Sequence, residues 1–153
     1  MFARNITGSS RTADIALVTD KGKVLKSGKI TIKGDGWTRY EIRLTSKAVP
    51  TKANCRLRLT FSGKGSTAID MVSLFPVNTF KGRRNGLRRD LAEAIAALKP
   101  KFMRFPGGCL THGDGIDNIY HWQESIGKLQ DRKPDRNLWG YHQTKGLGFY
   151  EYF

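Results

Sequence analysis

The chain has 153 residues, 39% of them hydrophobic and 26% charged, and its 27 lysines and arginines against 13 aspartates and glutamates give a formal net charge of +14. No apolar run is long enough to cross a membrane, and residues 2–7 lack the basic start and apolar core of a signal peptide. The basic residues are spread along the chain, with 14 against 5 acidic ones in residues 1–75 and 13 against 8 in residues 76–153. This spread favours a solvated basic surface over a nucleic-acid site.

The first half of the chain predicts five short strands, at residues 13–19, 29–33, 37–44, 55–61 and 67–74, with a longer loop at residues 46–54. In the second strand Ile30 and Ile32 alternate with polar neighbours, as expected for a strand with one buried face. The last strand is apolar on both faces, which predicts a place in the middle of a sandwich. Short strands at this spacing indicate a β-sandwich of the jelly-roll type.

The second half opens with a polar linker at residues 77–84 and continues into a predicted helix at residues 85–99, which Pro100 ends. Apolar side chains recur on one face of this helix, at Leu87, Leu91, Ala94, Ile95 and Leu98. Residues 101–105 then predict a short buried strand that runs into a glycine-rich turn. Helix, strand and turn in this order indicate an α/β unit, in which the loop after the strand handles ligands.

Arg104 interrupts the apolar strand at residues 101–105. A buried guanidinium is costly unless it meets a carboxylate or a ligand. Two interpretations follow: Arg104 belongs to a ligand site at the end of the strand, or it forms a structural ion pair.

Several motifs from residue 70 to the end of the sequence carry a resemblance to a known family. They are DMVSLFP at residues 70–76, the helix at residues 85–99, RFPGGC at residues 104–109, YHWQESIG at residues 120–127, NLWGY at residues 137–141 and GLGFYEYF at residues 146–153. In this order they resemble an α-L-arabinofuranosidase of glycoside hydrolase family 51. The first half resembles, more loosely, the carbohydrate-binding-type sandwich that some members carry.

The resemblance implies a β-sandwich followed by the beginning of a (β/α)8 TIM barrel. Residues 1–76 would be an N-terminally truncated carbohydrate-binding-like module, residues 77–84 the linker, and residues 85–153 the C-terminally truncated first part of the catalytic domain. The two glutamates that family members use for catalysis would lie beyond Phe153, so this polypeptide alone is expected to be inactive. The full enzyme would be a retaining hydrolase of arabinan or arabinoxylan that needs no cofactor, and such a polymer suggests an extracellular or periplasmic location.

The candidate substrate-binding residues are Arg104, Gly107, Gly108, Cys109 and Trp122. The resemblance implies that the arginine orders the sugar pocket and that the residue after the two glycines contacts the sugar. Many members have asparagine at that position, and the Cys109 thiol is a weaker donor. Trp122 either walls the pocket or packs beneath the long connection at residues 108–144, whose Asn118, Tyr120, Trp139 and Tyr141 could line a glycan groove.

Other sites find less support in the sequence. His112 with Asp114 and Asp117 lacks the paired spacing of a metal site, and Cys109 with His112 lacks a third group to orient a nucleophile. Cys55 lies in the other half from Cys109, which disfavours a disulfide. The alternative functions are a non-catalytic carbohydrate-binding module, for which Trp37 is the one exposed ring expected in the sandwich, and a basic nucleic-acid-binding domain. We expect no metal, no nucleic acid and no membrane as partners.

Overall fold

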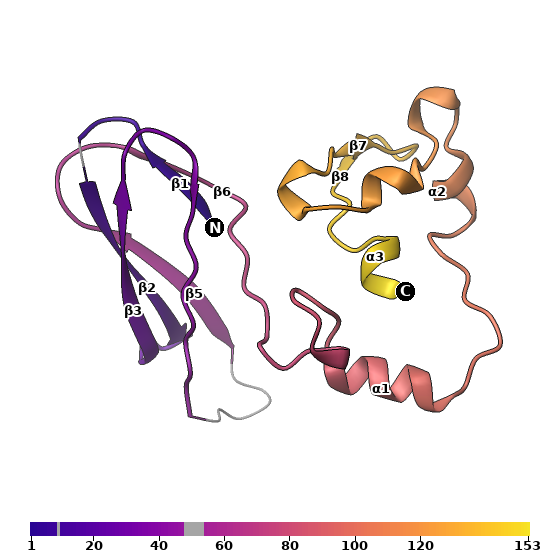
Figure 1. The fold of residues 1–153 in the computed structure, drawn as a ribbon, viewed down its shortest axis with the longest axis horizontal. Helices are drawn as coiled ribbons and strands as arrows, with labels where there is room; N and C mark the ends of the chain where they lie inside the picture. Colours follow the sequence, from indigo (N-terminus) through magenta and orange to yellow (C-terminus); the bar gives the residue numbers. More distant parts are fainter. Residues whose placement is uncertain (9, 48–53) are drawn as a thin grey trace. The chain divides into compact units, whose positions relative to one another are not determined.

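The computed structural model describes residues 1–8, 10–47 and 54–153 of the chain. They divide into two compact units, unit 1 at Met1–Leu74 and unit 2 at Phe75–Phe153 (Figure 1). None of the described helices has both the length and the apolar character that a membrane crossing requires.

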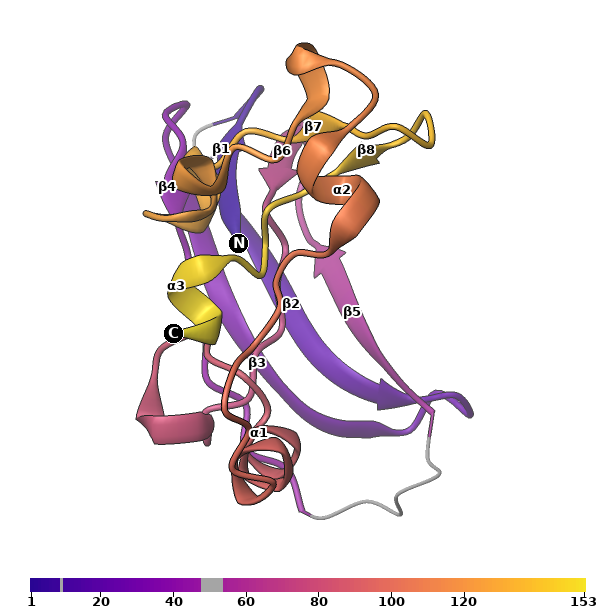
Figure 2. The ribbon, with the colours of Figure 1, turned by 90° about the vertical axis from the view of Figure 1, so that its right-hand side faces the viewer.

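Unit 1 contains two three-stranded antiparallel sheets (Figure 2). One has the order β4-β1-β6 and the other the order β3-β2-β5. The strands are β1 (Phe2–Asn5), β2 (Ser10–Thr19), β3 (Val24–Lys33), β4 (Thr38–Arg39), β5 (Cys55–Phe61) and β6 (Thr67–Asp70). The long strand β2 pairs with β3 on one side and with β5 on the other, so it is the central strand of the larger sheet.

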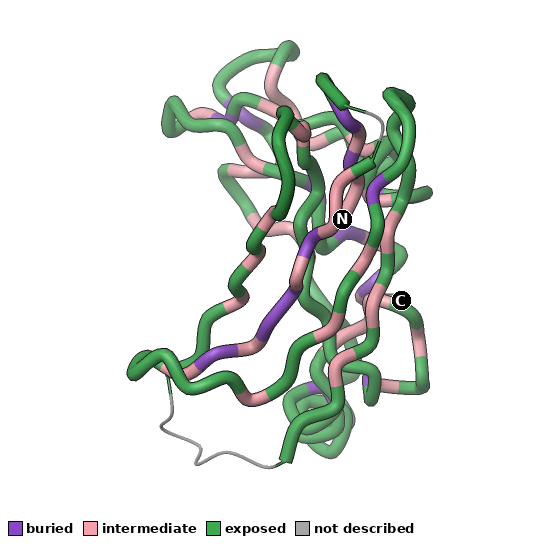
Figure 3. The backbone as a smooth tube through the Cα atoms, turned by 90° about the vertical axis from the view of Figure 1, so that its left-hand side faces the viewer, coloured by how far each residue is buried: buried purple, intermediate pink, exposed green. Residues whose placement is uncertain are grey.

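The apolar residues of both sheets contribute to one core. Its buried members are Ala3 of β1, Ala13 and Ile15 of β2, and Ile32 of β3. Partly buried side chains pack against it from Met1, Ile30, Tyr40, Ile42, Leu44, Leu57, Leu59 and Phe61. The alternation predicted for residues 29–33 and 55–61 is confirmed, because the charged residues between these positions are exposed. In Figure 3 the tube is mostly exposed, and its buried stretches are short.

Two predicted strands are shorter than expected. Within residues 37–44 only β4 is a strand, although Tyr40, Ile42 and Leu44 still pack against the core. The prediction of a buried central strand at residues 67–74 is wrong, because β6 ends at Asp70 on the edge of its sheet. In the register of this sheet Asp70 lies opposite Phe2, the first residue of β1, and the pairing of the two strands ends there. Most of the loop expected at residues 46–54 lies outside the described residues.

Unit 2 is built from short elements. They are η1 (Phe80–Gly82), α1 (Arg89–Ala97), α2 (Gly108–His112), η2 (Ile116–Asn118), η3 (Trp122–Ser125), η4 (Leu129–Asp131), β7 (Asp135–Arg136), β8 (His142–Gln143) and α3 (Phe149–Tyr152). β7 and β8 pair as a two-stranded antiparallel ribbon. The long connection after residue 108 is therefore organised into helical turns and a hairpin.

The predicted helix at residues 85–99 begins later than expected. Thr79 bridges Arg88, and Phe80 N donates to Leu87 O at 3.0 Å, so the chain forms a tight loop until α1 starts. Asn85, the first residue of the predicted helix, has a φ of +54° in this loop, and the N-cap is Arg88. The apolar side chains of the helix are exposed at Leu91, Ile95 and Leu98, and of this helix only Ala92 is buried.

The buried strand predicted at residues 101–105 is also absent. The segment has no strand partner among the described residues, and a strand without a partner leaves its backbone groups to water. Phe102 is 84% exposed, and the Arg104 guanidinium is on the surface. The cost of a buried charge, which made Arg104 conspicuous in the sequence, does not arise here.

Candidate functional site

A cluster of aromatic rings connects the candidate residues of unit 2. Phe105 is its centre, with ring centroids 4.7 Å from Tyr152, 5.3 Å from Phe149 and 6.0 Å from Tyr120. Trp122 joins the cluster through Phe149, at 5.7 Å. Edge-to-face and tilted contacts at these distances stabilise the cluster beyond the area they bury. The residue after Arg104 is therefore anchored on helix α3.

Four predicted site residues follow closely along the chain. Arg104 and Gly107 lie in the turn before α2, and Gly108 and Cys109 are the first two residues of that helix. Gly107 has a φ of +119°, which favours glycine there. A Cβ on Gly108 would lie 2.9 Å from Nη2 of Arg104, so the guanidinium covers this glycine closely. The Cys109 thiol is free and exposed. Four of the five predicted site residues thus lie next to one another.

Trp122 lies apart from that turn. It lines a hollow of about 300 Å³ together with Arg83, Ile126, Phe149, Tyr150 and Phe153. Ring contacts run from Phe105 through Phe149 to Trp122. The structure thus links Trp122 to the other predicted residues by packing.

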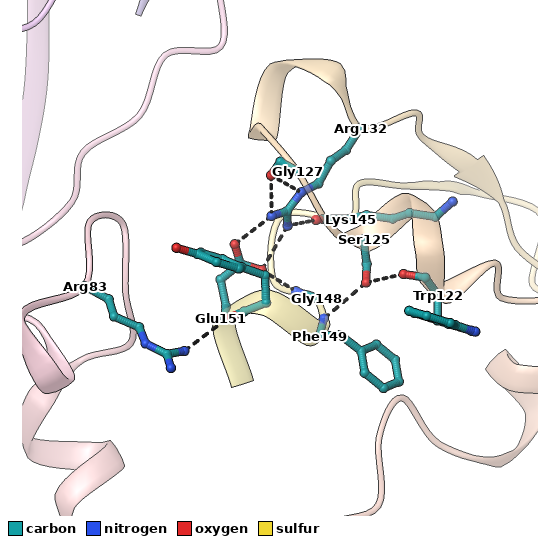
Figure 4. Close-up of polar contacts among 10 residues, drawn as sticks. Arg83, Trp122, Ser125, Gly127, Arg132, Lys145, Gly148, Phe149 and Glu151 are labelled. Atoms are coloured by element: carbon teal, nitrogen blue, oxygen red, sulfur yellow. Dashed lines mark hydrogen bonds and ion pairs between the residues drawn. The ribbon is translucent and has the colours of Figure 1, made fainter. Parts of the chain in front are cut away.

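The long connection is tied to α3 by a buried ion pair between Arg132 and Glu151 (Figure 4). The two side chains are 3% and 6% exposed and form a bidentate contact, with N–O distances of 2.9 and 2.8 Å. Arg132 also donates to Gly127 O at 2.9 Å and to Lys145 O at 2.8 Å. Glu151 Oε2 accepts a further hydrogen bond from Gly148 N at 2.8 Å. Both charged side chains therefore have several hydrogen-bond partners, which offset the cost of removing the charges from water.

A second buried cation lies beside it. The Lys145 ammonium is 1% exposed and contacts Glu124 as well as Asp135 Oδ2, the latter at 2.6 Å. Burial alone would lower the pKa of Lys145, but hydrogen bonds to Asp135 and Glu124 outweigh it and raise this pKa above its usual value. The hydrogen bond from Lys145 lowers the pKa of the Glu124 carboxyl. Both groups are therefore charged at neutral pH.

Ser125 joins η3 to α3. Its hydroxyl donates to Trp122 O at 2.7 Å and accepts from Phe149 N at 3.1 Å (Figure 4). Gly148 passes so close that a Cβ there would be 2.4 Å from Cβ of Ser125. Only glycine permits this approach, and the contact fixes Trp122 relative to α3.

The β7–β8 hairpin carries a pair of exposed rings. Asn137 is buried, and its Oδ1 accepts hydrogen bonds from Trp139 N at 3.1 Å and from Tyr141 N at 3.3 Å. The rings of Trp139 and Tyr141 stack with a centroid distance of 6.3 Å and an interplanar angle of 16°. These two of the four candidate groove residues thus lie side by side on the surface.

The remaining candidates have local roles. His112 contacts the neighbouring Gly113 O, and Asp114 bonds with Asn118 within one turn. Among residues 1–8, 10–47 and 54–153, no three His, Cys, Asp or Glu side chains gather in a group that could hold a metal ion. The four glutamates of the sequence are each within an ion pair, namely Glu41 with Arg39, Glu93 with Arg89, Glu124 with Lys145 and Glu151 with Arg132.

The buried ions were not identified from the sequence. Arg132 and Glu151 are 19 residues apart, and no local pattern connects them. One signal was present, because Glu151 follows Gly148 by three residues, the spacing at which an acidic side chain reaches back to the start of a helix.

Comparison with known proteins finds similar chains among the α-L-arabinofuranosidases. The family model for the "Alpha-L-arabinofuranosidase 1 domain" matches residues 94–153. An extracellular exo-α-L-arabinofuranosidase of Streptomyces chartreusis is 39% identical over 95% of this chain and 18% of its own length. α-L-Arabinofuranosidase 1 of Arabidopsis thaliana is 38% identical over 91% of this chain and 21% of its own.

A solved structure agrees with these relatives. The arabinose-bound α-L-arabinofuranosidase MgGH51 matches 99% of this chain and 25% of its own, with 36% identity and a TM-score of 0.84. In sequence and in fold the chain is thus similar to a segment of the α-L-arabinofuranosidases of glycoside hydrolase family 51, the family that its motifs predicted. It spans about a fifth of the length of the curated relatives it matches.

Proposed function

We propose that this chain is part of a retaining glycoside hydrolase that releases terminal α-L-arabinofuranosyl groups from arabinan- or arabinoxylan-type polysaccharides. The observation that carries the proposal is the similarity to the arabinose-bound MgGH51 enzyme over 99% of the chain, with 36% identity and a TM-score of 0.84. In a retaining mechanism two carboxyl groups lie about 5–5.5 Å apart, one as nucleophile and one as acid and then base. The family resemblance implies that both catalytic glutamates lie beyond Phe153, so in this proposal neither belongs to these 153 residues, whose four glutamates are each in an ion pair.

In this proposal residues 1–76 are a carbohydrate-binding-like β-sandwich, residues 77–84 are a linker, and residues 85–153 open the (β/α)8 barrel. The core shared by the two sheets of unit 1 supports the sandwich. The exposed apolar face of α1, at Leu91 and Ile95, supports the barrel, whose helices cover a sheet with such a face.

The proposed sugar-binding residues are Arg104, Gly107, Gly108, Cys109 and Trp122. Arg104 would supply a planar set of donors, and Gly107 and Gly108 would let the backbone approach the ring closely. The support is the continuity of the turn and its anchorage on the aromatic cluster.

The test of the activity is hydrolysis of 4-nitrophenyl α-L-arabinofuranoside and of arabinan. We expect turnover by the full-length enzyme and none by the 153-residue polypeptide. Turnover by the polypeptide that a single Glu→Gln change abolishes would contradict the assignment of the catalytic carboxylates. An inactive full-length protein would contradict the proposed activity.

The test of the site is Arg104→Lys in the full-length enzyme. Lysine keeps the charge but loses the planar donor geometry, so we expect kcat/KM to fall by about 1.5–3 kcal/mol of transition-state stabilisation, the size of a charge-assisted hydrogen bond. The matched control is Arg58→Lys, the same change at an exposed position of β5 in unit 1. Unchanged kinetics with a lowered Tm for Arg104→Lys would make Arg104 a structural residue.

A further inference from the structure

We propose that the buried Arg132–Glu151 ion pair positions the Arg104–Cys109 turn, acting through helix α3 and Phe105. Among the described residues no hydrogen bond or ion pair joins either charged side chain to the turn, so both are positioning residues. Only the consequence for sugar binding rests on the proposed function.

The Arg132–Glu151 pair is held rigidly. Arg132 makes five hydrogen bonds, which join Gly127, Lys145 and Glu151 at one guanidinium. Replacing a buried ion pair by apolar side chains of similar size is often neutral or stabilising, so stability alone does not explain such a pair. A bidentate contact is directional, and it fixes the orientation of the groups it joins.

The position of helix α3 depends on this contact. A helix of four residues has too few internal hydrogen bonds to persist without outside contacts. Glu151 lies within α3 and also accepts from Gly148 N at its start. At the other end Arg83 Nη1 donates to Tyr150 O at 3.1 Å, as cations do for the last carbonyls of a helix. The position of α3 is therefore set by side chains from elsewhere in unit 2.

Ring contacts connect α3 to the turn. Phe149 and Tyr152 are three residues apart and lie on one face of the helix. Both rings pack against Phe105, at 5.3 and 4.7 Å between centroids. Phe105 directly follows Arg104, so a displacement of α3 removes the packing that holds the start of the turn.

The test is hydrogen exchange in the full-length protein. The first variant is Glu151→Gln. The second is the double change Arg132→Met with Glu151→Leu, which removes the pair without leaving a lone buried charge. We expect the peptide at residues 104–113 to exchange about tenfold faster in both, while peptides of α1 keep their protection, because local opening is not shared by the whole unit. The matched control, Glu93→Gln, removes a carboxylate from the exposed Arg89 pair and should change neither.

A variant that leaves both charged side chains in place separates the loss of ring packing from misfolding caused by an unpaired buried charge. Phe105→Leu breaks the ring contacts and leaves the ion pair intact, and we expect the same local increase in exchange. The proposal is overturned if residues 104–113 keep their protection in Phe105→Leu or in the double variant, or if exchange rises equally over residues 75–153, as a merely structural role predicts.

Kinetics separate this inference from the proposed function. In an active enzyme we expect the double variant to raise KM severalfold with a smaller change in kcat, because a loosened turn binds sugar less well. A wild-type enzyme without arabinofuranosidase activity would overturn the proposed function, while hydrogen exchange would still decide whether the pair positions the turn.

Discussion

The two units are stabilised by different kinds of buried residue. The buried side chains of unit 1 are apolar, at Ala3, Ala13, Ile15, Ala16, Val18 and Ile32, with Asn5 as the polar exception. In unit 2 the only buried apolar side chain is Ala92. The others are Thr79, Ser125, Asn137, Lys145, Glu151 and the side chain of Arg132. Both statements concern the described residues. Unit 1 therefore depends on apolar burial beneath a strand ladder, and unit 2 on polar groups that must each find a partner.

The two units should respond differently to substitutions and to pH. An apolar core loses stability in proportion to the volume removed from it. A buried polar network loses stability when one partner is removed or changes its protonation, because the other partner is left unpaired. The same substitution or the same change of pH should therefore affect the two units unequally.

The largest effect is expected from Ile32→Ala in unit 1. Ile32 is the largest fully buried side chain among the described residues, at 0% exposed, and its loss leaves a cavity between the sheets. We expect a loss of about 2–5 kcal/mol in the free energy of unfolding of this unit. Native-state hydrogen exchange of the β2 and β3 amides measures it.

The control is the same chemical change at an exposed site. Ile6 in unit 1 is 60% exposed, and Ile6→Ala should alter stability by no more than about 0.5 kcal/mol. The comparison between the units would be broken if Ile32→Ala had as small an effect as Ile6→Ala, since unit 1 would then not depend on its core.

The sequence predicted unit 1 better than unit 2 for a physical reason. Alternation along β3 and β5 reflects a repeat of two residues that each strand displays by itself. The length of β6 was not predictable in this way, because it depends on the pairing of β6 with β1, more than 60 residues away in the sequence. Local pattern thus gave the strands, and the pairing of distant segments decided where they end.

In unit 2 the local pattern was less informative. The stripe on α1 identified a helix correctly, but the loop closed by Thr79 and Arg88 sets its first residue. The turn at Arg104 was predicted from its glycines, while the partners of Arg132 could not be, since side-chain ion pairs across 19 residues leave no periodic trace. A buried charge becomes recognisable only when the fold has placed its partner.

The smallest effect, and the sharpest test of the comparison, is the response of unit 2 to mild acid. The hydrogen bond from Lys145 lowers the pKa of Glu124 below its ordinary 4.5, so the unfolded chain binds this proton more readily than the folded one. The stabilisation is therefore present above pH 4.5 and is lost as the pH falls through the lower, folded value. The raised pKa of Lys145 acts only at the alkaline end, because its contribution is complete below its ordinary 10.5. As the pH falls below about 4.5 we expect protection, corrected for intrinsic exchange, to decline at residues 122–151, and to decline less in β2 and β3, whose buried residues are apolar. Glu124→Gln should remove much of this decline, whereas Glu93→Gln, at an exposed pair, should leave it unchanged. An equal decline in both units would mean that acid acts on the whole molecule and that the polar network of unit 2 has no special part in it.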